Sequence, residues 1–134
     1  MKRKPKVGFL PLYILTYDES TPFMRKTVDR HVAEVSERLE AMGLELVKAP
    51  VCRVKPEFEA AVKSFTDADV DLIITLHAAY SPSLESIDAL CSTNLPLLML
   101  DTTYDYEFKP YSYTEGMLYN HCLLYTSNAA DDKA

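Results

Sequence analysis

A single histidine, His77, stands directly after the apolar segment Leu72–Leu76 and shortly before the Ser81-Pro82 pair. Imidazole donates or accepts a proton near neutral pH and can hydrogen-bond a ligand hydroxyl. If the apolar segment is a strand of a parallel sheet, His77 lies at its carboxyl end, where such sheets bind ligands. The position therefore marks His77 as a candidate ligand-facing or interface residue.

Two other roles for His77 follow from its neighbours. As a structural histidine it would hydrogen-bond the start of the helix that Pro82 opens, and the sequence leaves this role and the functional one open. A metal-ligand role has less support, because no second histidine or carboxylate is close in sequence and only Asp101 could approach from the next apolar segment. We therefore predict no metal site and assign Asp101 to bracing a loop.

Nucleotide binding and disulfide formation find little support in the residue types present. The chain contains only three glycines, whereas a loop that cradles phosphates needs several close together. The three cysteines show no Cys-x-x-Cys spacing, which is typical of reduced thiols in the cytoplasm. Cys52 follows an apolar segment where a nucleophile could stand, but a two-cysteine mechanism needs a second thiol, and Cys91 is predicted to face inward on a helix.

Apolar segments alternate with amphipathic ones, and this alternation is what positions the candidate residues. Apolar side chains recur at helical spacing between Thr21-Pro22, a typical helix start, and Gly43, a typical helix end. In the last amphipathic segment we expect Leu84, Ile87 and Cys91 to face inward. Strands are predicted over Lys6–Tyr13, with a break at Pro11, and over Leu44–Pro50, Asp71–His77 and Leu95–Thr103. Helices are predicted to start at Pro22, Pro56 and Pro82.

This order of elements predicts an α/β domain of the flavodoxin-like or Rossmann-like kind. We expect a three-layer sandwich whose four-stranded parallel sheet has the strand order 2-1-3-4. The net charge of −6 argues against a nucleic-acid-binding surface. No apolar run approaches the roughly 20 residues of a membrane-spanning helix, so we expect no membrane association. The carboxyl ends of the strands would bring together Leu12–Tyr13, Pro50–Cys52, His77–Tyr80 and Asp101–Thr103.

The final segment, residues 122–134, differs in character from the rest of the chain. It reads CLLYTSNAADDKA and is very similar to CLLYTSDAADE, the peptide that results when a sequencing-library adapter is translated. We therefore interpret residues 122–134 as a non-native read-through tail, and residues 1–121 as one domain cut from a longer protein. A native acidic tail is the alternative. If residues 1–121 are one domain of a longer protein, the absence of catalytic residues from this chain reflects its truncation.

Three stretches together resemble the N-terminal domain of the L-fucose/L-arabinose isomerase family. They are KVGFLPLYILTYDE at residues 6–19, LVKAPVCRV at 46–54 and DLIITLHAAYSPSLESIDALCSTNLPLLMLDTT at 71–103. The strongest element is Leu-His-x-x-aromatic-Ser-Pro, followed by Asn-x-Pro-Leu-Leu, because arabinose isomerases have a similar LHTFSP and NKPLL pair at like spacing. The resemblance extends over residues 6–121.

The resemblance implies that the parent protein is a cytoplasmic aldose–ketose isomerase of carbohydrate metabolism. In this family a divalent metal, usually Mn²⁺, polarises the sugar oxygens, and carboxylates move a proton between adjacent carbons through an enediol. The family's metal ligands and catalytic glutamates lie in later domains. The resemblance therefore assigns no catalytic residue, no metal ligand and no bound cofactor to this chain, which alone is expected to be inactive.

In the family, this first domain is a flavodoxin-like unit that helps to build the sugar pocket of a neighbouring subunit, which implies a homo-oligomer. By position, Leu12 and Tyr13 in the loop after the first strand are substrate-binding candidates, with His77 as the third. The loop PLYILTYD departs from the Gln-x-Leu-Tyr-Gly loop of arabinose isomerases, so the sugar stays unassigned. The family's Asn-x-x-x-His-Gly segment begins at Asn120, and no role is carried over to His121.

The main alternative is a non-catalytic flavodoxin-like module that binds a small sugar or effector. The reading frame after the codon of His121 separates the two hypotheses. A long continuation with glutamate and histidine metal ligands favours the isomerase, and a nearby stop codon favours the module.

Overall fold

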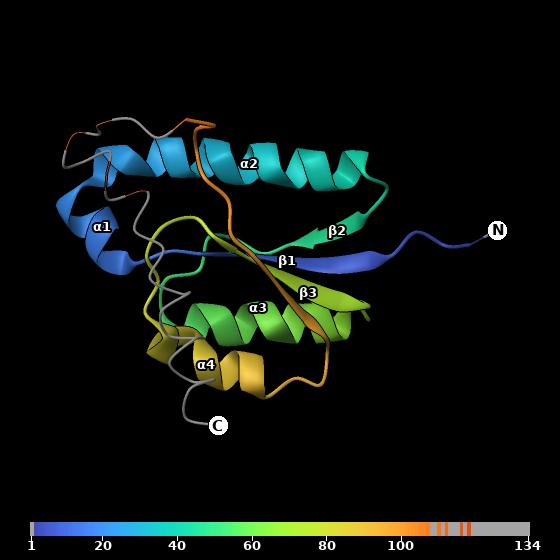
Figure 1. Ribbon diagram of the computed structural model, residues 1–134. Helices are drawn as coiled ribbons and strands as arrows, with labels where there is room; N and C mark the ends of the chain where they lie inside the picture. The colour runs from blue at the N-terminus through green and yellow to red at the C-terminus, as the bar shows by residue number, and fades with distance from the viewer. Residues whose placement is uncertain (1, 108–109, 111, 113–115, 117, 119–134) are drawn as a thin grey trace, which may run out of the picture.

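A four-stranded parallel sheet with helices on both faces forms the centre of the computed structural model, which describes residues 2–107, 110, 112, 116 and 118 (Figure 1). The strand order is β2-β1-β3-β4, and each neighbouring pair is parallel. The predicted flavodoxin-like α/β fold and its strand order are thus confirmed. The strands are β1 (Lys6–Leu12), β2 (Glu45–Lys48), β3 (Leu72–His77) and β4 (Leu97–Leu100).

The helices form two layers. On one face lie α1 (Leu15–Ser20) and α2 (Arg25–Ala41), joined by the short 3-10 helix η1 (Pro22–Met24), and on the other lie α3 (Lys55–Asp67) and α4 (Ser83–Cys91) (Figure 1). The sequence pattern does not predict α1. The expected cap Thr21 instead donates its hydroxyl to the carbonyl of Tyr17, at 3.0 Å, and so closes α1. The residues of the proposed tail, together with Asn120 and His121, lie outside the described part of the chain.

The central strands β1 and β3 are buried on both faces, as their continuous apolar sequences predict. At Gly8 an added Cβ would lie 2.6 Å from the ring of Phe65, so α3 can pack this closely on β1 only because the residue is glycine. Alternate residues of the strands pack toward opposite helical layers: Val7, Phe9, Ile74 and Leu76 toward α2, and Leu10, Leu12 and Ile73 toward α3 and α4.

Helix α4 is oriented differently from the prediction. The three residues expected to face inward are exposed, and Leu84 has 82% of its surface accessible. The buried residues of α4 are Ser86 and Ala89. Small side chains let a helix approach its neighbours closely, and α4 packs on the core through Ser86, Ala89 and the partly buried Leu90, which leaves Leu84 and Ile87 outside.

Strand β4 also departs from expectation, because its apolar residues are not buried. Leu98 is 53% exposed, and Leu97 and Met99 are exposed to a similar extent. No described strand pairs with the outer edge of β4. Helix α4 and strand β4 thus both carry exposed apolar residues, which are Leu84, Ile87, Leu97, Leu98 and Met99.

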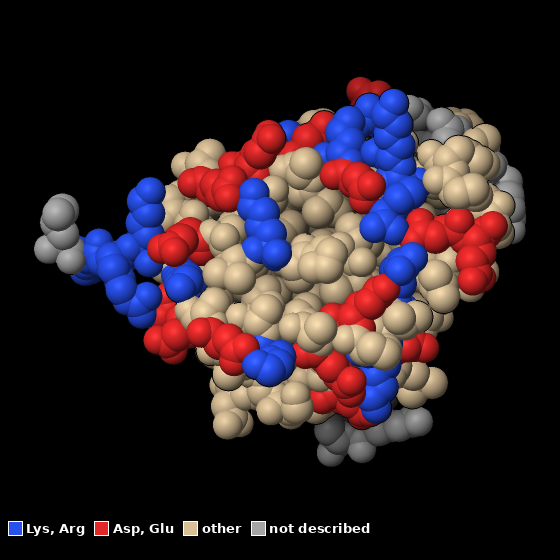
Figure 2. Space-filling view, turned by 180° about the vertical axis from the view of Figure 1, so that it is seen from behind, with Lys and Arg blue, Asp and Glu red and all other residues tan. Residues whose placement is uncertain are grey.

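Charged side chains of both signs are interspersed around the rim of the molecule when it is viewed from behind (Figure 2). Some are paired across elements: Lys48 of β2 lies 2.9 Å from Glu40 of α2. Within the described residues, no helix has the length and apolar character that a membrane crossing requires.

Candidate functional site

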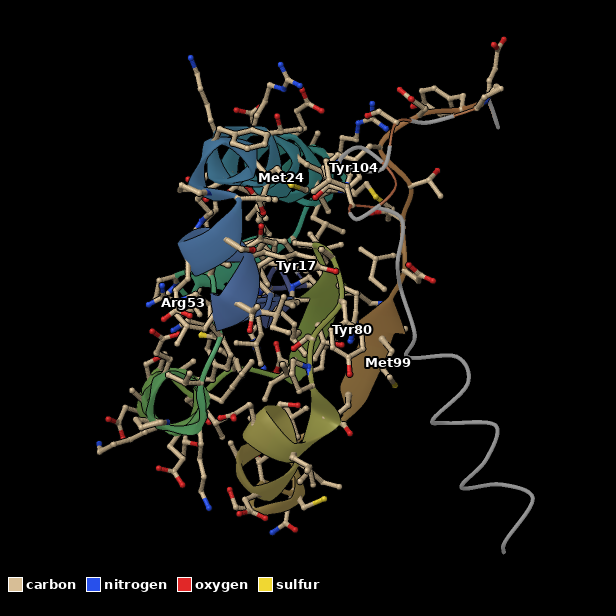
Figure 3. All side chains as sticks on the ribbon, turned by 90° about the vertical axis from the view of Figure 1, so that its left-hand side faces the viewer. Tyr17, Met24, Arg53, Tyr80, Met99 and Tyr104 are labelled. Atoms are coloured by element: carbon tan, nitrogen blue, oxygen red, sulfur yellow. The ribbon has the colours of Figure 1, made fainter. Side chains whose placement is uncertain are left out.

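Strands β1, β3 and β4 end at one edge of the sheet, and Figure 3 looks onto this edge. Tyr13 follows β1, Ala78 follows β3, and the segment 101–106 follows β4. Backbone hydrogen bonds tie these ends together: the Ala78 N–H donates to the Leu12 carbonyl at 3.0 Å, and the Tyr13 N–H donates to the Cys52 carbonyl at 2.9 Å. The segments named from the sequence thus lie at the carboxyl edge of the sheet, the edge at which parallel sheets generally bind ligands.

Tyr13 carries a buried hydroxyl at this edge. Its side chain is 0% exposed, and its hydroxyl has no hydrogen-bond partner within the described part of the chain. Burial raises the pKa of the phenol to about 12, with the Asp18 carboxylate as the next cause, so the hydroxyl stays protonated at neutral pH. Such a group can donate a hydrogen bond to a ligand oxygen and accept one from a ligand hydroxyl. The apolar residues buried around Tyr13 are Met24, Val28, Ala78, Ala79 and Leu118.

The ring of Tyr13 is held by residues of α1 and α2. The guanidinium carbon of Arg25 lies 5.8 Å from the ring centroid, within the range of a cation–π interaction. Tyr17 meets the ring edge-on, with centroids 5.9 Å apart and planes at 76°. In Figure 3, Tyr17 and Met24 lie on the same side of the sheet edge as Tyr104. These contacts fix the direction of the Tyr13 ring.

Two arginines at this edge are neutralised by carboxylates. Asp18 accepts from Arg25 at 2.6 Å and from Arg53 at 3.0 Å, and Arg53 also donates to Glu57 at 2.6 Å. Hydrogen bonds from Arg53 hold the pKa of Glu57 below its usual value, and those to Glu57 and Asp18 raise the pKa of Arg53. The network places α1, α2 and α3 relative to one another. Since both cations are already paired, the edge suits a neutral polar ligand better than an anion.

The structure separates the other two predicted site residues from Tyr13. Leu12 is buried and packs in the core beneath α3 and α4. His77 is 2% exposed and pairs in register with Leu12, and strand alternation places both on the face covered by α3 and α4. Tyr13 packs on the opposite face, with α2. The substrate roles of Leu12 and His77 remain predictions, and the position of His77 favours its structural role.

Sequence reasoning missed the part played by the segment 101–106: it predicts Asp101–Thr103 as the end of the last strand, and the residues from Tyr104 on, which lack periodicity, as a surface loop. Strand β4 in fact ends at Leu100. Thr102 lies 2.9 Å from Nε2 of His31, and the ring of Tyr104 stacks on His31 with centroids 4.0 Å apart. The Tyr104 hydroxyl donates to the carbonyl of Ala78, and burial raises the pKa of this phenol. A groove of about 380 Å³ lies between α2 and this segment. The several tyrosines after Thr103 were the available signal.

Metal and thiol chemistry find no built site in the part of the chain that the structure describes. No group of three or more His, Cys, Asp or Glu side chains there could hold a metal ion. Cys52 is buried, and desolvation raises the pKa of its thiol to about 12, so it is not an activated nucleophile. Among the candidates, Tyr13 is therefore the residue whose geometry best suits ligand contact.

Comparison with known proteins does not identify a family for this chain. No family model matches the chain, and no curated protein is significantly similar to it. The resemblance to sugar isomerases remains a prediction from the sequence.

Proposed function

We propose that this chain is the N-terminal domain of a cytoplasmic aldose–ketose isomerase of the L-fucose/L-arabinose type, and that it contributes to the substrate pocket and to oligomer contacts. The observation that carries the proposal is the Tyr13 hydroxyl, which is buried without a partner at the carboxyl edge of a parallel sheet. A buried hydroxyl left unsatisfied costs about 1–3 kcal/mol, and a ligand hydroxyl would remove that cost. Sugars supply such hydroxyls.

The chemistry assigned to this chain is binding and orientation. Because the pKa of the Tyr13 phenol is about 12, Tyr13 carries no charge at neutral pH and acts as a hydrogen-bond partner rather than as a base. Its fixed ring would orient one sugar hydroxyl, which limits the conformations available to the substrate. The described residues do not fit Mn²⁺, so no step through a metal is derived for them. The proposal assigns the metal and the proton-transfer carboxylates to the rest of the parent protein.

The proposed oligomer contact uses the exposed apolar residues of α4 and β4, with a second copy of the parent protein as the partner. Large apolar side chains left exposed at a sheet edge and on the helix beside it are candidates for a protein interface. In the parent protein, Leu98→Asp should therefore shift the mass measured by light scattering toward the monomer. Met42→Asp is the matched control, because Met42 is also exposed but lies at the end of α2. An unchanged mass for Leu98→Asp removes this surface from the proposal.

The isomerase proposal is tested by activity of the recovered full-length protein with L-fucose and L-arabinose in the presence of MnCl₂. Tyr13→Phe should lower kcat/KM by about tenfold, the effect of one lost hydrogen bond of roughly 1.4 kcal/mol, without loss of folded protein. Met42→Ala is the control, because Met42 is 78% exposed at the end of α2 and should leave kcat/KM unchanged. Sugar binding without turnover in the full-length protein would favour the non-catalytic module instead.

The same assay separates the two roles of His77. If His77 serves the pocket, His77→Ala weakens turnover much more than stability. If it is structural, as its position beside Leu12 favours, the variant melts at lower temperature while the folded fraction keeps its kcat/KM.

A further inference from the structure

Side-chain contacts hold the segment 101–106 across the sheet edge, against helix α2 and the end of strand β3. Thr102 contacts His31 in α2, the Tyr104 hydroxyl donates to the Ala78 carbonyl after β3, and the Tyr106 hydroxyl accepts from Arg38 of α2 at 3.0 Å. We call these residues, 101–106, the strap. In Figure 1 the strap leads from β4 toward α2. No strand or helix is assigned to the strap, so side-chain contacts such as these hold it in place.

Tyr104 is the residue of the strap that reaches Tyr13. It packs against the apolar cluster that buries Tyr13, and the proximity of Tyr13 is a further cause of the raised pKa of Tyr104. Its ring is fixed on one side by the stacked His31 and at its hydroxyl by the Ala78 carbonyl. Tyr104 therefore forms part of the cover that leaves the Tyr13 hydroxyl inaccessible to solvent.

A group that is fully covered cannot meet a ligand unless its cover moves. We propose that Tyr104 is a positioning residue: it closes the Tyr13 pocket, and opening of the strap admits a neutral polyol to the Tyr13 hydroxyl. The identity of the ligand as a polyol rests on the proposed function, whereas the covering of Tyr13 by Tyr104 is inferred from the contacts alone. The strap is suited to opening because it belongs to no strand or helix, so it can move without breaking the hydrogen bonds of the sheet. Closure over a bound sugar would exclude water from the pocket.

The cover is tested with the 134-residue chain by O-acetylation of tyrosines with N-acetylimidazole at neutral pH, with Tyr13 followed by peptide mass spectrometry. Tyr104→Ala should raise the acetylation rate of Tyr13 by about tenfold, which corresponds to an opening free energy lower by about 1.4 kcal/mol. Tyr104→Phe keeps the ring and should retain most of the protection. Met42→Ala is the matched control, because Met42 is exposed at the end of α2 and makes no contact that the proposal uses, so it should leave the Tyr13 rate unchanged.

Equilibrium unfolding of each variant separates local opening from general loss of stability. If Tyr104→Ala does not fold, Thr102→Val is used instead: it removes one strap contact, leaves Tyr104 in place, and should expose Tyr13 more than Met42→Ala does. An unchanged Tyr13 rate in Tyr104→Ala, or an equal rise in Met42→Ala, overturns the proposal that Tyr104 covers Tyr13. A separate arm adds L-fucose or L-arabinose to Tyr104→Ala. If neither sugar protects Tyr13 from acetylation, the result counts against the proposed function but not against the covering role of Tyr104.

Discussion

Replacing Tyr13 by phenylalanine removes one atom from a fully buried position. The hydroxyl of Tyr13 has no partner among the described residues, whereas the ring keeps its contacts with Arg25 and Tyr17. If a buried hydroxyl has a structural role, its removal lowers the free energy of unfolding. If it serves ligand binding and has no partner in the unliganded protein, its removal can raise the free energy of unfolding.

The size of the effect follows from the burial of the hydroxyl. An unsatisfied buried hydroxyl costs about 1–3 kcal/mol of stability, and the small cavity left by its removal offsets part of the stability gained. We therefore expect Tyr13→Phe to raise the free energy of unfolding of the 134-residue chain by about 1 kcal/mol and the Tm by about 4 °C. Urea denaturation followed by circular dichroism measures the first quantity, and thermal melting measures the second.

Tyr104→Phe is the matched control for this experiment. It removes the same atom from a nearby tyrosine whose hydroxyl donates to the Ala78 carbonyl. Loss of that bond should lower the free energy of unfolding by about 1 kcal/mol, opposite in sign to Tyr13→Phe. A Tyr13→Phe variant that is destabilised by as much as Tyr104→Phe would refute the reasoning, since its hydroxyl must then have a structural partner.

Three further predictions concern the core, the thiols and the tail. Gly8→Ala should cost roughly 1–3 kcal/mol of unfolding free energy in urea melts, because its Cβ would meet the Phe65 ring, and a neutral result contradicts the close packing. Iodoacetamide at pH 8 should label exposed Cys91 and spare Cys52, whose pKa of about 12 keeps the thiol protonated; labelling of native Cys52 at the same rate would contradict its burial. Deleting residues 122–134 should change stability by less than about 0.5 kcal/mol in the same melts, and a loss of several kcal/mol would identify the tail as native structure.

The fold could be predicted because its signals are local and repeated. The apolar run Leu72–Leu76 and the helical spacing of Phe58, Ala61, Val62 and Phe65 each specify an element, and their alternation leaves few arrangements of a parallel sheet. The orientation of α4 could not be predicted in this way. Its apolar stripe and its small residues both form a plausible inner face, and tertiary packing selected the small one.

The candidate site was predicted less completely than the fold. The sequence places Leu12, Tyr13 and His77 at one edge, but only the pairing register shows that Leu12 and His77 share a face and Tyr13 points to the other. Tyr104 belongs to a segment without periodicity, and its contacts with His31 and Ala78 depend on long-range packing. Such contacts leave no regular pattern in a single sequence.

The most direct test of the central claim is the genomic DNA sequence downstream of the codon for His121. The account predicts that the reading frame there departs from CLLYTSNAADDKA and continues into further domains that carry glutamate and histidine metal ligands. A genomic sequence that encodes this same tail and then stops would contradict the claim that the chain is the first domain of a sugar isomerase.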